Sequence, residues 1–327
     1  MKLEQTFMNF MLRHQESHHR TYNFLVLLEG ITTAAKYIQH YYHTGSLRNL
    51  MGEAGLTNVQ GESVMKMDVI ANAVVLHYLR HSHQVIQAVS EEENEITTIN
   101  PEGGRYFVYF DPLDGSSNVK HNLPVGFMFG IAKRNVEGDE DLHLRRGDEY
   151  RAAGIFIIPT GVFILALKDS GVWHFQMDET ATFVRPTALT IPEEGKGLEL
   201  SYNAARTATF ARPVQEWIAL NSPRFDFRYM GALAGDFLRI LRNGGMFMYP
   251  AIVNHENPAK NRPKGKLRLL YEANVAAFIA REAGGFAVDE QGRDILAIEP
   301  EYPHQRTALY VGSRSVVEDI RTVLTPR

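Results

Sequence analysis

The chain contains no cysteine among its 327 residues. Without thiols, the sequence excludes disulfide bonds, thiolate metal sites and thiol-based switches. Positive charge is not in excess either, because 34 Lys and Arg stand against 38 Asp and Glu, for a net charge of −4. A dedicated nucleic-acid-binding protein needs a basic surface that releases phosphate counterions, so this balance argues against a nucleic-acid partner.

Long hydrophobic runs are also missing from the sequence. No apolar stretch reaches the ~20 residues that a membrane-spanning helix needs, and the first residues lack the apolar core of a signal peptide. We find no internal repeat and no low-complexity segment. We therefore expect a cytoplasmic protein with no membrane partner. Hydrophobic residues make up 44% of the chain and charged residues 22%, which is typical of a globular protein with an ample core.

The most informative stretch runs from Phe107 to Asn118. Residues 106–110 are aromatic or β-branched and predict a buried strand. We expect this strand to end at Asp111-Pro112, because proline has no N–H to donate within a central strand. Two carboxylates, Asp111 and Asp114, then lie three residues apart at its carboxyl end. Small polar residues follow them, with N–H and hydroxyl groups that can face an anion: Gly115, Ser116, Ser117 and Asn118.

Paired carboxylates beside a donor-rich turn suit a hard divalent cation that bridges to a phosphate. The alternative is an ordinary acidic turn, because Asp, Pro, Gly, Ser and Asn are all common turn residues. Their order, straight after a buried strand, favours the metal and phosphate site.

Other acidic residues lie at the ends of predicted elements. A short strand over residues 85–89 leads into Ser90 and three glutamates that begin with Glu91 and Glu92. Such a run is commonly a solvated surface, but strand ends are also where α/β sheets bind ligands. Asp68 lies in the first turn of a helix predicted to reach about Arg80, where it can complement the helix dipole. The glycine-punctuated residues 52–63 before it predict a long loop of the kind that forms mobile lids.

The remaining patterns suggest two domains. An amphipathic helix is predicted over residues 21–43, and two antiparallel strands are predicted within 152–167. The polar segment 187–197 is the best domain boundary. We therefore expect an N-terminal α+β domain over residues 1–192 and a C-terminal α/β domain over 193–327.

The expected C-terminal domain contains a predicted helix over 228–242 and a predicted strand over 246–249. Residues 264–272 alternate cationic and apolar side chains before another helix. Lys266 and Arg268 share one face of this predicted strand, where they either solubilise the chain or bind phosphate. Glu272 lies at the start of the following helix, where a carboxylate is favourable whatever its role.

Together these segments resemble the class I fructose-1,6-bisphosphatases of the lithium-sensitive phosphatase superfamily. The stretches that carry the resemblance are residues 52–61, 67–69, 90–92, 110–118, 201–203, 228–231, 244–251, 264–272 and 304–306. The aspartate motif at 110–118 indicates only the superfamily. The Lys-Leu-Arg-Leu-Leu-Tyr-Glu run at 266–272 separates this family from the inositol monophosphatases, which carry a Trp-Asp motif there.

The resemblance implies a five-layered αβαβα sugar-phosphatase fold of the α+β and α/β type in two subdomains, usually assembled as a homotetramer. It implies magnesium-dependent hydrolysis of the 1-phosphate of fructose 1,6-bisphosphate in gluconeogenesis. A sedoheptulose-1,7-bisphosphatase or a dual-specificity enzyme is the alternative, because the same site accepts a longer sugar. A non-catalytic sugar-phosphate sensor is disfavoured, because every expected metal ligand is present.

The resemblance also implies roles for individual residues. Two or three magnesium ions, with manganese as an alternative, are expected on Glu91, Asp111, Asp114, Glu272 and the main-chain oxygen of Leu113. Catalytic handling of the attacking water is expected from Asp68, Glu91 and Glu92. The leaving phosphate is expected at Gly115, Ser116 and Ser117. The phosphate that stays is expected on Asn203, Tyr229, Tyr249 and Lys266, with Arg228 reaching in from a neighbouring subunit and Arg268 beside the metals and the sugar. The loop over 52–63 is expected to be the lid that brings Asp68 over the site.

Three positions depart from the family pattern. Asn274-Val275 stands where Asn-Pro is usual, and Arg206 stands where a tyrosine usually serves the phosphate that stays. The glycine-containing turn that binds AMP in many members is replaced by residues 18–22, His-His-Arg-Thr-Tyr, although Arg105-Tyr106 match a later part of that site. Without these glycines we expect AMP inhibition to be weak or absent.

Overall fold

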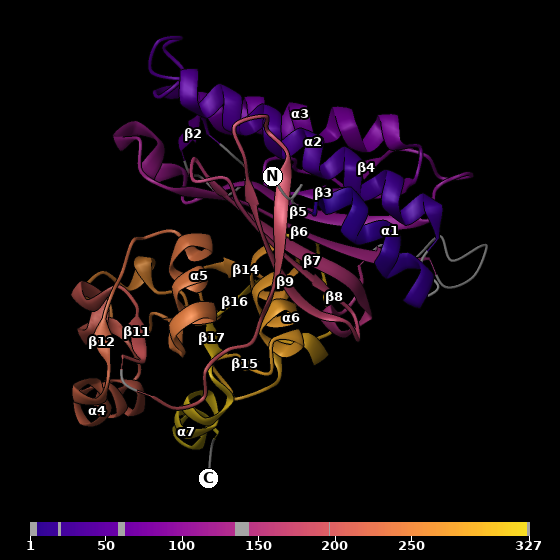
Figure 1. Cartoon of the computed structure of the whole chain (residues 1–327). Helices are drawn as coiled ribbons and strands as arrows, with labels where there is room; N and C mark the ends of the chain where they lie inside the picture. Colours follow the sequence, from indigo (N-terminus) through magenta and orange to yellow (C-terminus); the bar gives the residue numbers. More distant parts are fainter. Residues whose placement is uncertain (1–4, 19–20, 58–62, 135–143, 196, 326–327) are drawn as a thin grey trace.

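Two large β-sheets and three layers of helices form the protein in the computed structural model, which describes residues 5–18, 21–57, 63–134, 144–195 and 197–325. Figure 1 shows the two sheets one above the other, with helices on both outer sides and between them. Among the described residues, no helix is long and apolar enough to cross a membrane.

The larger sheet has eight strands. In spatial order they are β10 (Phe183–Leu189), β9 (Gly171–Met177), β8 (Val162–Leu167), β7 (Tyr150–Ile158), β6 (Val125–Lys133), β5 (Tyr106–Asp114), β3 (Val85–Ser90) and β4 (Thr97–Thr98). All neighbours pair antiparallel except β3 and β5, which run parallel. The parallel pair brings the carboxyl ends of β3 and β5 to one edge of the sheet, so Glu91, which follows β3, meets Asp111 and Asp114 in the last part of β5.

The smaller sheet has five strands. In spatial order they are β12 (Asp226–Phe227), β11 (Glu199–Ser201), β13 (Gly245–Tyr249), β17 (Leu309–Gly312) and β15 (Phe286–Val288). Two further pairs of strands are β1 (Glu53–Thr57) with β2 (Ser63–Met65), and β14 (Leu267–Arg268) with β16 (Arg306–Thr307).

The α-helices are α1 (Phe7–His18), α2 (Tyr22–Thr44), α3 (Lys66–Ser82), α4 (Arg212–Asn221), α5 (Leu233–Asn243), α6 (Asn274–Glu282) and α7 (Arg314–Leu324). Short 3-10 helices are η1 (Ser116–His121), η2 (Gly147–Glu149), η3 (Ala204–Thr209), η4 (Ser222–Arg224), η5 (Pro258–Lys260) and η7 (Ile295–Ala297). A π-helical turn, η6 (Leu269–Ala273), leads directly into α6.

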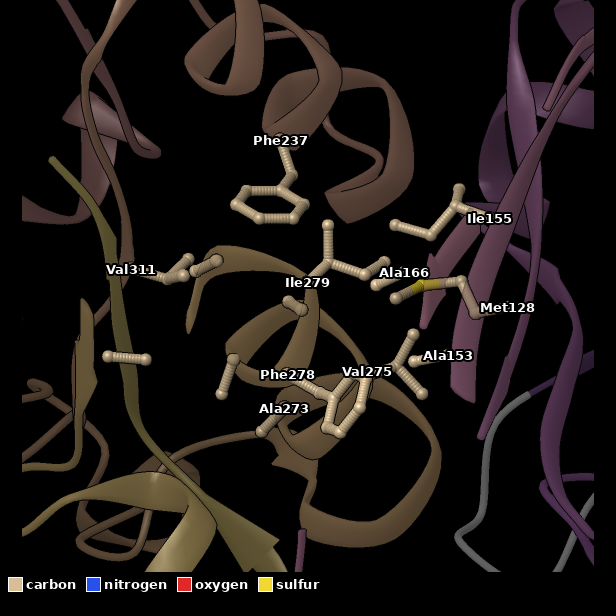
Figure 2. Close-up of a cluster of buried hydrophobic side chains, with 14 of the residues drawn as sticks. Met128, Ala153, Ile155, Ala166, Phe237, Ala273, Val275, Phe278, Ile279 and Val311 are labelled. Atoms are coloured by element: carbon tan, nitrogen blue, oxygen red, sulfur yellow. The ribbon is translucent and has the colours of Figure 1, made fainter. Parts of the chain in front are cut away.

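Three hydrophobic clusters define the layers. One joins α1, α2 and α3 to the face of the larger sheet that carries Phe127. The second lies between the sheets, where Met128 and Ile155 pack with Phe237 of α5, Ile279 of α6 and Val311 of the smaller sheet (Figure 2). The third joins α4 and α7 to the other face of the smaller sheet. The expected αβαβα layering is therefore confirmed.

The elements with a strong local pattern form as predicted. Helix α2 buries the apolar positions of the predicted 21–43 helix, and the 152–167 segment forms the antiparallel pair β7 and β8. Strand β13 covers the predicted 246–249 strand. The expected division at residue 192 falls between β10 and β11, and it stays a prediction.

Strand β5 and the segment before α3 differ from the prediction in where their elements begin or end. Strand β5 does not end at Asp111 but continues to Asp114, with a register shift against β6 between these two residues. Pro112 lies in this bulge, where the strand needs no ladder hydrogen bond from it. The predicted loop over 52–63 is partly a hairpin, β1 and β2, and residues 58–62 lie outside the described part of the chain.

Two predictions in the C-terminal half were wrong about length. The helix predicted over 228–242 begins only at Leu233, because the preceding loop folds onto Asp236, which accepts the N–H groups of Met230 (2.8 Å) and Gly231 (3.0 Å). The strand predicted within the alternating segment 264–272 is restricted to β14, because the chain turns into η6 at Leu269.

Gly126 allows α5 to pack closely against the larger sheet. A Cβ on Gly126 of β6 would overlap the Cβ of Ala234 at the start of α5. We expect Gly126→Ala to destabilise the fold by about 1–3 kcal/mol, the usual cost of overpacking. Urea denaturation measures this, with Gly52→Ala as control, because a Cβ on Gly52 meets nothing within 4 Å. Equal unfolding midpoints for the two variants would contradict the close contact.

Candidate metal and phosphate site

The parallel pairing of β3 and β5 sets Glu91 beside Asp111. Ser90 is in register with Phe110, and the N–H of Glu91 donates to the carbonyl of Phe110 at 3.1 Å. Glu91, the residue after β3, and Asp111 of β5 therefore lie side by side at the same end of the two strands.

Three buried carboxylates converge at this edge. One oxygen from each of Asp111, Asp114 and Glu272 lies within 4.8 Å of the other two. Their orientation is fixed by backbone donors: the N–H of Leu113 donates to Asp111 (2.8 Å), that of Ala234 to Asp114 (2.7 Å) and that of Arg268 to Glu272 (2.6 Å). An all-oxygen ligand set of this size fits a hard divalent cation such as magnesium.

The cluster carries an electrostatic cost unless a cation or protons neutralise it. Burial, with a further contribution from the charge of Glu91, raises the pKa of Asp114 to about 7 and the pKa of Glu272 to about 8. Burial, followed by repulsion from Glu91, Asp114 and Glu272, raises the pKa of Asp111 well above its ordinary value. The three side chains therefore form a site that a divalent cation would stabilise in its fully ionised form.

Glu91 and Arg268 form an ion pair beside the three carboxylates. Arg268 Nη2 lies 3.0 Å from Glu91, and its Nη1 lies 3.9 Å from Glu272. Arg268 is therefore next to the candidate metal site, as the resemblance implies, and it offsets part of the negative charge. Leu113 lines the same cleft and is buried.

Asp68 approaches the cluster from the first turn of α3. Its Oδ2 accepts the N–H of Met65 at 2.8 Å, and its buried Oδ1 has no hydrogen-bond partner among the described residues. Burial, together with the nearby charge of Glu91, raises the pKa of Asp68 to about 7 against the opposing hydrogen bond from Met65. One oxygen is thus anchored, the other has no partner among the described residues, and Asp68 lines the cleft.

A network that sequence reasoning missed ties α3 to the glutamate turn. Asn72 donates to Glu93 Oε1 at 2.7 Å and accepts from Ser90 Oγ at 2.7 Å, while Ser90 Oγ also accepts the N–H of Glu92 at 3.2 Å. Asn72 lies four residues after Asp68, so the helical period places both on one face of α3. That spacing was a signal available in the sequence. The network fixes Asp68 relative to Glu91 and Glu92.

The donor-rich turn follows Asp114 directly. Gly115 has φ +79°, a conformation that favours glycine, and a Cβ there would overlap Ala232. Ser116 and Ser117 then open η1 and line the cleft, and the Asn118 amide fixes this segment by donating to the Pro124 carbonyl at 3.1 Å.

The carboxylate cluster, Asp68 and the turn from Gly115 to Ser117 line one cleft of about 510 Å³. The expected residues that line it are Asp68, Glu91, Glu92, Asp111, Leu113, Asp114, Gly115, Ser116, Ser117, Asn203, Tyr229, Tyr249, Lys266, Arg268 and Glu272. Arg228 is the exception: it is exposed, and its Nη1 donates to the Phe227 carbonyl at 2.8 Å. Lys120 and Asp236 also line the cleft, and sequence reasoning did not select them.

The sequence matches known proteins along nearly its whole length. The family profile described as "Fructose-1-6-bisphosphatase, N-terminal domain" matches residues 5–185, and the profile for the C-terminal domain matches residues 191–325. A fructose-1,6-bisphosphatase class 1 of Syntrophus aciditrophicus is 59% identical over 99% of this chain and 98% of its own length. One of Cytophaga hutchinsonii is 37% identical over 91% of this chain and 88% of its own.

The structure matches as well. The holo form of fructose-1,6-bisphosphatase from Leishmania major superposes with a TM-score of 0.89 at 29% identity, covering 99% of both chains. The T-state structure of the same enzyme gives a TM-score of 0.84 at 30% identity, covering 100% of both chains. The fold and these matches together define the class of protein, an enzyme among the phosphoric monoester hydrolases. The chain belongs to the class 1 fructose-1,6-bisphosphatase family.

The raised pKa values predict how metal and pH act on stability. Because the folded-state pKa values of Asp114 and Glu272 lie above those of unfolded carboxyls, their contribution is present at low pH and is lost as pH rises through about 7 to 8. We expect the metal-free protein to lose unfolding free energy between about pH 6 and pH 8.5. Magnesium should restore it, by about 2.7 kcal/mol at 100 times its Kd.

Urea denaturation with a chelator and with magnesium, at both pH values, measures this effect. Sodium chloride at matched ionic strength is the control, since general screening should not replace the ion. A magnesium effect no larger at the higher pH would contradict the assignment of Asp111, Asp114 and Glu272 as a metal site.

Proposed function

We propose that this protein hydrolyses the 1-phosphate of fructose 1,6-bisphosphate to give fructose 6-phosphate and phosphate, with magnesium as cofactor, and that it serves gluconeogenesis. The observation that carries the proposal is one cleft shared by the buried carboxylates, the Gly115 turn and the polar side chains of Asn203, Tyr229, Tyr249 and Lys266. Family membership supports the choice of substrate. A cytoplasmic location stays a prediction from the sequence.

The metal would be held by Asp111, Asp114 and Glu272, with Glu91 and the main-chain oxygen of Leu113 as the further expected ligands. When bound, magnesium supplies positive charge to the phosphate and favours ionisation of a bound water. Manganese, with the same preference for oxygen ligands, is the alternative ion. The number of ions, expected to be two or three, stays a prediction.

Asp68 is suited to orient the attacking water and take its proton. Its anchored Oδ2 fixes the carboxylate, and its Oδ1, without a hydrogen-bond partner among the described atoms, can accept a proton. Glu92 lies on the turn that the Asn72 and Ser90 network holds against α3, so it is the expected second carboxylate at the water.

The two phosphates of the substrate require different surroundings. The transferred phosphate fits the Gly115, Ser116 and Ser117 turn, because this turn lines the cleft next to the carboxylate cluster and its backbone N–H groups and hydroxyls can donate to an anion. The phosphate that stays fits the polar side chains Asn203, Tyr229, Tyr249 and Lys266. Its binding energy holds the sugar in position for in-line attack.

Arg228 lies on the surface at the end of the edge strand β12 and does not line the cleft of its own chain. From there it is available to a neighbouring copy, which agrees with the homotetramer that the resemblance implies. The assembly stays a proposal.

The decisive measurement is phosphate release from fructose 1,6-bisphosphate with and without magnesium. We expect no release without the ion, and we expect Glu272→Gln to lower the rate by about 100-fold or more, because a charged ligand of the site is lost. Glu216→Gln is the matched control, since Glu216 is exposed and pairs with Arg212 on α4. Equal rates for the two variants would exclude this mechanism.

The same assay separates the alternative substrate. Sedoheptulose 1,7-bisphosphate carries its phosphates on a longer sugar. The ratio of the kcat/KM values for the two bisphosphates identifies the preferred substrate.

Regulation by AMP gives a separate prediction. The turn expected to replace the AMP site includes residues 19 and 20, which lie outside the described part of the chain, while Thr21 Oγ1 lies 3.1 Å from the Tyr106 hydroxyl. We expect no inhibition by micromolar AMP, because the glycines that would let the backbone wrap a phosphate are missing. Activity titrated with AMP measures this, and half-inhibition at micromolar concentration would refute it.

A further inference from the structure

Arg206 lies among the residues of the cleft that the proposed function assigns to the phosphate that stays. It belongs to η3, whose N-cap residue is Asn203, and its N–H donates to the Asn203 carbonyl at 3.0 Å. Its side chain lines the cleft together with Tyr229 and Tyr249. Its positive charge also opposes the raised pKa of the Tyr229 hydroxyl, which places the guanidinium within electrostatic reach of that ring.

The backbone of η3 is fixed although Arg206 itself is exposed. The Thr209 hydroxyl donates to the Arg206 carbonyl at 2.7 Å, and the Thr207 hydroxyl donates to the Ala204 carbonyl at 2.8 Å. The following segment is fastened in turn, because the N–H of Val253 donates to the Thr209 carbonyl at 2.9 Å. The arginine therefore extends from a positioned backbone into the cleft.

The guanidinium of Arg206 is available to a ligand. Among the described residues its side chain makes no hydrogen bond and no ion pair. The other arginine that lines the cleft, Arg268, is buried and pairs with Glu91 and Glu272. Arg228 donates to its neighbouring carbonyl and does not line the cleft. Arg206 is thus the cleft arginine whose donors are not engaged by these carboxylates.

A free arginine in this position has a specific chemistry. Its planar fork donates two parallel hydrogen bonds to a phosphate, which a tyrosine hydroxyl cannot do. Arg206 and Lys266 together supply two positive charges, which match the charge of a phosphate monoester dianion. The tyrosine hydroxyls and the Asn203 amide add neutral donors around the same group.

We propose that Arg206 is a substrate-binding residue that contacts the non-hydrolysed phosphate, so that this second phosphate site has its own arginine within a single chain. The proposal rests on the proposed function for the identity of the substrate. Because Arg206 lines the cleft of its own chain and Arg228 does not, we expect binding of the second phosphate to depend more strongly on Arg206.

The test compares Arg206→Gln, Arg206→Lys, Arg228→Gln and the control Arg212→Gln, which changes an exposed arginine on α4 that pairs with Glu216. Calorimetric titration with fructose 6-phosphate in the presence of magnesium measures the site without turnover. We expect Arg206→Gln to weaken this affinity by about tenfold or more, the scale of a charged hydrogen-bonded contact. Arg206→Lys keeps the charge without the fork and should fall between Arg206→Gln and the wild type.

Steady-state kinetics give the second readout. With fructose 1,6-bisphosphate, Arg206→Gln should raise KM by a larger factor than it lowers kcat, because the contact is made in both ground state and transition state. Arg212→Gln should match the wild type in both assays. Thermal unfolding of each variant verifies folding, which an exposed side chain should not disturb.

Each alternative outcome has a distinct meaning. Unchanged fructose 6-phosphate affinity in Arg206→Gln overturns the proposal, as does a larger loss in Arg228→Gln than in Arg206→Gln. A wild-type protein that binds neither fructose 6-phosphate nor inorganic phosphate overturns it too. A wild-type protein that binds fructose 6-phosphate through Arg206 but releases no phosphate from the bisphosphate contradicts the proposed function and leaves this binding role standing.

Discussion

The structure depends on the burial of several carboxylates at one edge of a β-sheet. Asp111, Asp114 and Glu272 are almost fully buried, and Glu91 lies beside them. Like charges in a low-dielectric interior repel strongly, and several kcal/mol per ion is the usual desolvation cost. The surrounding structure offsets this cost with directed N–H donors, with Arg268 and with a geometry that accepts a divalent cation. The cleft, the first turn of α3 and the donor-rich turn are all arranged around this charge.

The parts of the fold that depend on local pattern could be predicted from the sequence. The period of apolar residues gave α2, and the aromatic run at 106–110 gave the start of β5. The parts that depend on distant contacts could not. The loop before α5 is held by Asp236, and the bulge in β5 depends on its pairing with β6. Neither partner is visible in a local window of sequence.

The same distinction applies to the site. Residue types and spacing selected Asp111 and Asp114, and the resemblance supplied the roles of the other acidic positions and most of the remaining lining residues. The network through Asn72 and Ser90 was missed, since each partner is an ordinary polar residue until α3 and β3 are placed side by side. Lys120 shows the opposite limit: its charge is plain in the sequence, but only the structure shows that it lines the cleft.

The first turn of α5 connects the two sheets. The N–H of Ala234 donates to Asp114 of the larger sheet, while Asp236, in the same turn, accepts the Ser201 hydroxyl of the smaller sheet at 2.9 Å. A sliding of one sheet past the other would therefore pull on a donor to the carboxylate cluster. Coupling between two sites is reciprocal. An ion that favours one position of the Asp114 side chain would therefore also favour one relative position of the two sheets, and a shift between the sheets would change the affinity for the ion.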